Sequence, residues 1–124
     1  RMGGTCIPEL CTLYTGINFY EIVIKLAIGE LFSESFPRLS GAWSANLLRS
    51  KKTGNAGKMD ANIKQNKQHF VEIKLDYPLG GFIPKFNTGN QRIGHVITKS
   101  NNLEHAENIS QKFEEDFQKS MEWF

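Results

Sequence analysis

The chain begins Arg1-Met2-Gly3-Gly4-Thr5-Cys6-Ile7-Pro8, and this stretch decides how the rest is interpreted. Adjacent glycines lack a Cβ and can adopt positive φ, so backbone there can come close to a ligand. Pro8 predicts the first residue of a helix, because its missing N–H costs nothing at that position. The unpaired N–H groups and positive dipole end of that helix would face the glycines and, with Arg1, suit a phosphate or carboxylate. The plainer interpretation is a glycine turn beside an exposed arginine, since so short a motif is a weak signal.

Two short amphipathic helices are predicted directly after this loop. Apolar residues recur at helical spacing in both, on one face each: Ile7, Leu10, Cys11 and Tyr14, then Phe19, Ile22, Val23 and Leu26. Gly16 is expected to end the first helix. Asn18 is expected to cap the second, with Glu21 completing a capping box, and Gly29 to end it. Taken alone, these are core helices that set the angle at which the glycine loop is presented.

Four motifs in residues 1–30 occur in a characteristic order: Arg-Met-Gly-Gly, Ile-Pro-Glu-Leu, Tyr-Thr-Gly-Ile-Asn-Phe and Ala-Ile-Gly-Glu. Together they resemble the end of an ATP-grasp domain, in the branch of carboxylate–amine (L-amino acid) ligases and carbamoyl-phosphate-synthetase-like enzymes. In that branch the segment follows a magnesium-binding Glu-x-Asn and runs Asn-x-Arg-x-Gly-Gly, helix, Thr-Gly-[Ile/Val]-Asp, helix. Asn18 stands where the family usually has Asp, and Thr5 stands where Asp is common. Both replacements keep a side chain that can cap a helix.

The resemblance implies that the ATP pocket and the magnesium ligands lie upstream of Arg1. The chain is then expected to be a C-terminal fragment of a larger enzyme, which an opening Arg with Met second also favours. Such enzymes use ATP and magnesium to activate a carboxylate as an acyl-phosphate, which an amine-type nucleophile attacks. By the same resemblance, Arg1 is the expected catalytic residue, stabilising the transferring phosphoryl group, and the amides of Gly3 and Gly4 bind the substrate carboxylate or oxyanion. Neither activity nor bound ATP or magnesium is expected of these residues alone.

Composition narrows the class of protein. The 124 residues, 40% hydrophobic and 23% charged, suit one ordinary globular domain and argue against disorder. A net charge of +2, from 15 basic and 13 acidic residues, is too balanced to predict binding to nucleic acid or a membrane surface. No apolar run approaches the roughly 20 residues that span a bilayer. Cys6 and Cys11 would lie on different faces of the first helix, so no disulfide is expected and a reducing, cytoplasmic setting is favoured.

The pattern changes after a predicted linker at residues 31–41. Strands are predicted at 42–49, 69–77 and 92–98, the second with strict alternation and the third with Gly94 inviting close backbone approach or a bulge. A long helix capped by Asn101 should follow, with an apolar stripe for packing on the sheet: Leu103, Ala106, Ile109, Phe113, Phe117 and Met121. The predicted fold is therefore α+β, with two N-terminal helices, a small mostly antiparallel sheet and a C-terminal helix. Residues 1–30 are assigned to the tail of the catalytic domain and 42–124 to a small subdomain, whose Gly80-Gly81 and Arg92-Ile-Gly-His-Val segments also resemble that enzyme branch.

Other polar groups are interpreted structurally. The three histidines, His69, His95 and His105, lie on separate predicted elements without ligand spacing, so no metal site is expected. Gly80-Gly81 is no phosphate loop, because no Lys-Ser/Thr follows it. Arg92 is expected to form a structural salt bridge.

Two classes of function stay open. The first is the ligase, whose partners would be the missing N-terminal ATP-grasp core and small-molecule carboxylate and amine substrates. The second is a non-catalytic α+β docking or oligomerisation module. The N-terminal helices carry more apolar residues than a small sheet is expected to bury, which predicts an interaction surface for that core or for a homo-oligomer.

Overall fold

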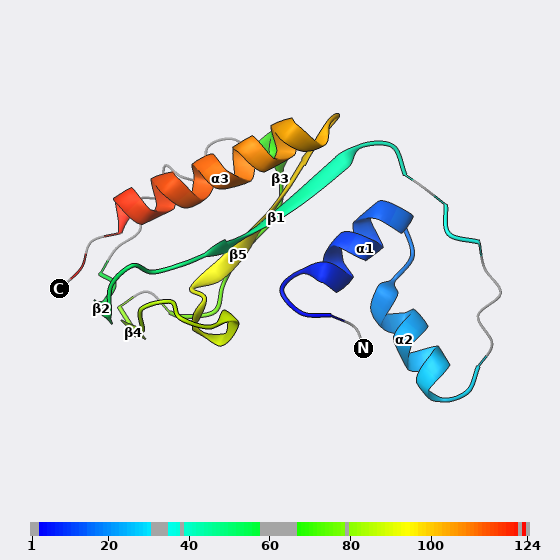
Figure 1. Ribbon diagram of the computed structural model, residues 1–124, viewed down its shortest axis with the longest axis horizontal. Coiled ribbons are helices and arrows are strands. Elements are labelled where there is room, and N and C mark those ends of the chain that lie inside the picture. The colour runs from blue at the N-terminus through cyan, green and yellow to red at the C-terminus, as the bar shows by residue number, and fades with distance from the viewer. Residues whose placement is uncertain are drawn as a thin grey trace.

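The computed structural model describes residues 3–30, 35–37, 39–57, 67–78, 80–121 and 123. It confirms the predicted α+β fold, with two N-terminal helices, an antiparallel sheet and a long C-terminal helix (Figure 1). The helices and strands are α1 (Ile7–Thr15), α2 (Phe19–Ala27), β1 (Ala42–Leu48), β2 (Gly54–Asn55), β3 (Phe70–Leu75), β4 (Phe82–Ile83), β5 (Gly94–Ser100) and α3 (Leu103–Ser120). Two 3-10 turns, η2 (Lys67–His69) and η3 (Gly89–Gln91), precede β3 and β5.

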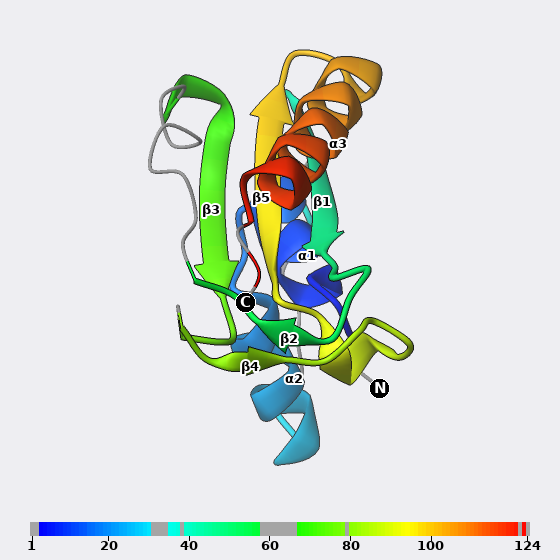
Figure 2. The same cartoon turned by 90° about the vertical axis from the view of Figure 1, so that its left-hand side faces the viewer.

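The main sheet has the order β1-β5-β3, and both pairs are antiparallel (Figure 2). β5 is central, and its residues 94–98 are all buried, because helices cover both faces of the sheet there. Its register sets Gly94 opposite both Leu48 of β1 and Leu75 of β3. A second, two-stranded ribbon pairs β2 with β4. The strand predicted at 92–98 corresponds to β5, which begins at Gly94. Arg92 therefore lies in the segment that leads into this strand.

A bulge in β3 corrects the strict alternation predicted for residues 69–77. The register shifts between Phe70 and Glu72, so that Phe70 pairs with Thr98 but Ile73 pairs with Val96. An extra residue in one strand of an antiparallel pair has this effect. Phe70 and Ile73 consequently both pack against the core, although their odd separation in sequence placed them on opposite faces. Val71, which was expected to be on the core side, is 40% exposed.

The core lies between the sheet and α3. Its buried members are Leu48, Ala56, Ile83, Ile93, Val96, Phe113, Phe117 and Met121. Phe113 is central, with its ring centre 5.2 Å from that of Phe70 and 6.4 Å from that of Phe117. The buried face of α3 differs from the predicted stripe, because Ser110 is buried and Leu103 is exposed. Ser110 is accommodated by hydrogen bonds to Ser44 Oγ (3.2 Å) and Glu107 O (2.9 Å), which satisfy its hydroxyl.

The helix termini follow local side-chain chemistry, with small corrections. Asn18 caps α2 as predicted, its Oδ1 accepting from the N–H groups of Tyr20 and Glu21 at 3.1 and 3.4 Å. The Glu21 carboxylate forms an ion pair with Lys25 at 2.8 Å. Gly16 ends α1 with a φ of 71°, also as predicted.

For two helices the structure differs by one residue from the predicted N-terminal end. α3 is capped by Asn102, not Asn101, because Asn102 Oδ1 accepts from His105 N at 2.8 Å. The prediction of Asn101 depended on Glu104, which lies three residues later and would complete a capping box. α1 begins at Ile7, one residue before Pro8, and no side chain caps it.

α1 packs on the face of the sheet opposite α3, and α2 packs against α1 (Figure 1). α1 contacts β1, with the Tyr14 and Trp43 rings edge to face at 6.4 Å. α2 is joined to α1 by bonds from Phe19 N to Thr12 Oγ1 (3.0 Å) and from the Tyr20 hydroxyl to a carboxylate on α1 (2.6 Å). The division of the chain into a catalytic-domain tail (1–30), a linker (31–41) and a small subdomain (42–124) stays a prediction.

Among the described helices, none combines the length and apolar character needed to cross a membrane.

Candidate functional site

The glycine loop is a tight turn that leads into α1. Arg1, the predicted catalytic residue, lies outside the described residues, whereas both glycines are described. Gly3, Thr5 and Cys6 all have left-handed backbones, with φ of 77°, 52° and 69°. Such values are uncommon for residues other than glycine and carry a conformational cost. The turn therefore persists because the surrounding structure holds it.

The two glycines have different surroundings. A Cβ added to Gly3 would lie 3.1 Å from Ile7 Cδ1, in a backbone conformation that disfavours side chains. A Cβ added to Gly4 would meet nothing within 4 Å, and its φ is not in the left-handed range. Gly3 is thus required by the turn itself. Gly4 is not, and its backbone is open to approach from outside the chain.

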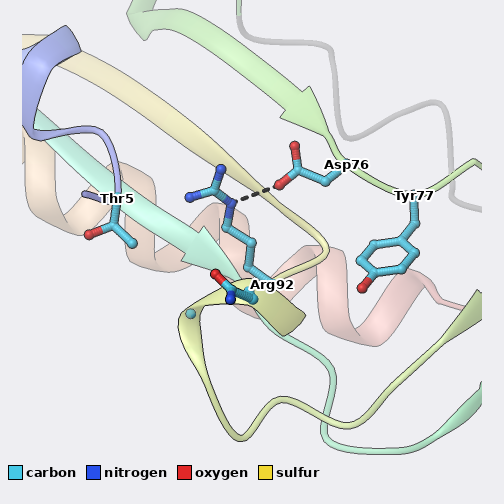
Figure 3. A pocket seen from close by; sticks show the side chains of 6 residues that line it. Thr5, Asp76, Tyr77 and Arg92 are labelled. Carbon is cyan, nitrogen blue, oxygen red and sulfur yellow. Dashed lines mark hydrogen bonds and ion pairs between the residues drawn. The ribbon is translucent and has the colours of Figure 1, made fainter.

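The loop opens onto a polar pocket of about 420 Å³ (Figure 3). The residues that line it are Thr5, Asp76, Tyr77, Gly89, Asn90 and Arg92. Thr5 comes from the glycine loop, Asp76 and Tyr77 follow β3, and the others belong to the segment that leads into β5. Three stretches that are distant in sequence therefore meet at one end of the sheet, and two of them, the glycine loop and Arg92, were singled out from the sequence.

Arg92 and Asp76 form the ion pair at the centre of this pocket. Arg92 Nε donates to Asp76 Oδ2 at 2.7 Å, and each side chain is 27% exposed. This hydrogen bond raises the pKa of the guanidinium above its usual value. The backbone fixes the pair, since Asp76 N–H donates to Ile93 O at 2.7 Å. The salt bridge predicted for Arg92 is confirmed. The two terminal nitrogens of the Arg92 guanidinium make no hydrogen bond to another described residue and face the pocket (Figure 3).

Close approach of β3 and β5 holds this end of the sheet together. A Cβ on Gly94 would collide with the backbone carbonyl of Lys74 and with Leu75 Cα. Only glycine fits there, which confirms the predicted close backbone approach. The contact sets the separation between the two segments that carry Asp76 and Arg92.

Four polar side chains on α1, α2 and the main sheet form two pairs, and of these four only His95 is buried. His95 Nε2 and Glu72 Oε2 are 3.3 Å apart, and the His95 side chain is 6% exposed. Glu9 Oε1 accepts the Tyr20 hydroxyl at 2.6 Å. Two atoms of this group, His95 Nδ1 and Glu9 Oε2, are buried without a hydrogen-bond partner among the described residues. The Tyr20–Glu9 hydrogen bond joins α2 to α1, and the His95–Glu72 pair joins β5 to β3.

Burial and neighbouring charges shift the pKa values of Glu9 and of the nearby Cys6 in the directions that follow. Burial alone would raise the pKa of Glu9, but the hydrogen bond from Tyr20, a bond to its own backbone N–H and the charges of His95 and Arg92 lower it below its usual value. Burial, reinforced by the Glu9 carboxylate, raises the pKa of the Cys6 thiol to about 11. Cys6 therefore stays protonated at neutral pH and is a poor nucleophile. Cys6 and Cys11 are both free, and Cys6 is the buried one.

Metal ligands do not gather at this pocket. In the described part of the chain, no group of three or more His, Cys, Asp or Glu side chains could hold a metal ion. The sequence analysis missed Asp76 as a site residue. A signal existed, because an acid directly after one strand and an arginine just before the next can meet when those strands pair.

Comparison with known proteins identifies solved structures that have a similar fold. No protein-family model matches the sequence, and no curated protein matches it. Two crystal structures match over the whole of this chain. Phosphoribosylglycinamide synthetase from Anaerococcus prevotii has a TM-score of 0.73, 24% identity and 31% of its length covered. L-amino acid ligase from Bacillus licheniformis has a TM-score of 0.71, 19% identity and 30% of its length covered.

Both of these proteins are ATP-grasp enzymes, so the resemblance inferred from residues 1–30 is confirmed at the level of the fold. The chain spans less than a third of the length of either enzyme. Its fold is similar to that of one segment of each of these two enzymes.

Proposed function

We propose that this chain is the C-terminal part of an ATP-grasp ligase that activates a carboxylate as an acyl-phosphate for attack by an amine-type nucleophile. The observation that carries the proposal is the match of the entire fold to one segment of two such enzymes. The glycine loop agrees with it, because that loop borders a polar pocket. ATP and magnesium would be held by a catalytic core that precedes Arg1, and they supply the phosphoryl group and neutralise its charge.

The residues of this chain would act on the acyl group rather than on the nucleotide. Arg1 would offer a planar guanidinium to the charge that develops during phosphoryl transfer. The amides of Gly3 and Gly4 would donate to the substrate carboxylate or to the oxyanion formed on attack. Gly4 suits this task because no atom of the described residues lies within 4 Å of the position that a Cβ would take.

The adjoining pocket would bind an anionic group of one substrate. Asp76 holds Arg92 through Nε, which leaves the terminal nitrogens for a carboxylate or phosphate. The Thr5 hydroxyl and the Asn90 amide lie at the same pocket and add hydrogen-bonding capacity. Asp76 would therefore orient the guanidinium and not contact substrate itself.

The outer surface of α2 would pack against the missing core. Ile24, Leu26 and the adjacent Ile28 are 62%, 56% and 67% exposed, whereas Ile22 is buried against the rest of the chain. Exposed apolar patches of this kind mark interaction surfaces. The occupant we propose is the preceding ATP-grasp core, because the matched enzymes are more than three times the length of this chain. Self-association of the isolated chain that disappears when the core is present would agree with this occupant, whereas a stable dimer in both forms would favour a second copy.

The test is ATP-dependent phosphate release by the full-length enzyme, with candidate carboxylate and amine substrates. Arg1→Ala should lower turnover by about 10²–10³ with the melting temperature unchanged. Arg1→Lys should recover little, because an ammonium cannot reproduce the two-pronged fork. Arg92→Ala should raise KM for one substrate. Lys51→Ala, in an exposed loop on a different pocket, is the matched control and should behave as wild type. Near-normal turnover of Arg1→Ala would remove Arg1 from the active site.

The alternative is a non-catalytic docking or oligomerisation module, which the exposed surface of α2 favours. The encoded sequence immediately upstream discriminates between the two. A Glu-x-Asn just before Arg1, preceded by a lysine-bearing β-rich segment, decides for the ligase. Its absence decides for the module.

A further inference from the structure

Two histidines that lie far apart in the sequence come into contact in the fold. His69 is the last residue of η2, and His105 lies in the first turn of α3. Their ring centres are 5.5 Å apart, with an angle of 63° between the planes. They lie at the start of β3, whereas Asp76 and the pocket lie beyond its other end. Both rings reach the surface, since His69 is half-buried and His105 is exposed.

The ring nitrogens are oriented by their neighbours. His69 Nδ1 donates to Lys99 O at 3.3 Å, because a carbonyl oxygen can only accept. In the neutral ring this leaves the lone pair on Nε2. His105 Nδ1 is 2.9 Å from Ser100 Oγ, to which it can donate in the same way. Hydrogen bonding of Nδ1 to an oxygen is the arrangement that prepares Nε2 of a histidine for a metal ion.

We propose that His69 and His105 form a surface site for one divalent transition-metal ion, Cu²⁺, Ni²⁺ or Zn²⁺, bound through the two Nε2 atoms. With metal–nitrogen bonds of about 2.1 Å, imidazoles at neighbouring positions of one ion have ring centres roughly 4.5–5.2 Å apart. The observed separation of 5.5 Å is close to this range. The described residues offer no third His, Cys, Asp or Glu ligand, so water completes the coordination.

The site is preorganised by backbone that does not depend on the metal. Lys99 and Ser100 end the central strand β5, and the backbone N–H of His105 is held by the Asn102 cap at 2.8 Å. A bound ion would therefore join the start of β3 to α3. The site is chemically distinct from one for magnesium, because that ion prefers oxygen ligands. It is also independent of the proposed ligase activity.

The experiment is calorimetric titration of the untagged chain with CuCl₂, NiCl₂ and ZnCl₂ at neutral pH. One ion should bind per chain, with Cu²⁺ tightest, as the usual order of affinities requires. His69→Ala and His105→Ala should each weaken binding at least tenfold, and Ser100→Ala should weaken it by about 10-fold to 100-fold. Lys99→Ala is the matched control, because its hydrogen bond with His69 is made by the backbone carbonyl, which the substitution keeps, and its affinity should equal that of wild type.

A second measurement needs no variant and stays decisive if a variant unfolds. In ¹⁵N-edited spectra of the unmodified chain, Zn²⁺ should shift the Nε2 resonances of His69 and His105 and leave those of the buried His95 in place. Magnesium should shift none of them. Unshifted Nε2 resonances at saturating Zn²⁺ would overturn the proposal, as would a doubly substituted His69→Ala/His105→Ala chain that binds as tightly as wild type.

Discussion

Alanine at each of the two loop glycines should have opposite effects on stability. At Gly3 the φ of 77° is left-handed, which costs a residue with a Cβ about 1–2 kcal/mol. The new Cβ would also lie 3.1–3.3 Å from the Ile7 side chain, but that side chain is exposed and can turn away. At Gly4 nothing lies within 4 Å, and the loss of unfolded-chain entropy should stabilise by about 0.4–1 kcal/mol.

Thermal unfolding of the isolated chain, followed by circular dichroism, measures this difference. For a chain of this size, Gly3→Ala should lower the melting temperature by roughly 3–8 °C, while Gly4→Ala should leave it unchanged or raise it slightly. Equal melting temperatures for Gly3→Ala and wild type would show that the loop opens independently of the core. A fall for Gly4→Ala as large as that for Gly3→Ala would refute the difference in surroundings.

The same pair of positions tests the ligand-facing role. In the full-length enzyme, Gly4→Val should lower turnover roughly tenfold or more, equivalent to about 1.4 kcal/mol, because its side chain fills the space through which a substrate reaches the backbone. Its folding should be preserved. Turnover within twofold of wild type, in a folded protein, would show that substrate does not approach Gly4.

Three further predictions concern the scaffold. Asn102→Ala should destabilise the chain by about 1 kcal/mol through loss of the α3 cap, while Asn101→Ala should be nearly neutral in the same urea titration. Iodoacetamide at pH 8 should alkylate Cys11 well before Cys6, whose thiol is buried and has a pKa of about 11, and peptide mass spectrometry after timed quenching will rank them. Because the pKa of Glu9 is lowered on folding, its stabilising contribution is present above the unfolded pKa and disappears as pH falls through the folded value. Glu9→Gln should therefore melt below wild type at pH 7, and the gap should narrow as the pH is lowered below the unfolded pKa of the carboxyl group; an unchanged gap would contradict this assignment.

Local physics made most of the elements predictable from the sequence. The apolar periodicity of residues 7–26 and 103–121 marked the helices, and the side chain of Asn18 and the backbone freedom of Gly16 marked two of their ends. These signals act within a few residues, so they need no knowledge of the fold. The order of motifs in residues 1–30 likewise predicted a resemblance that the fold of the whole chain supports.

Tertiary structure decided the features that depend on register and packing. The bulge after Phe70 and the burial of Ser110 arise from what lies opposite in β5 and β1, which an alternation pattern cannot reveal. Two successive asparagines can each cap α3, and the structure uses Asn102.

The pocket and the histidine pair have the same origin. The sequence by itself determined the glycine loop, the arginine and the histidines as separate chemical groups. Pairing of β3 with β5 brought Asp76 to Arg92 at one end of the sheet, and the docking of α3 brought His105 to His69 at the other. Contacts between residues distant in sequence form only when strands pair and helices pack, because each needs the geometry of both partners at once.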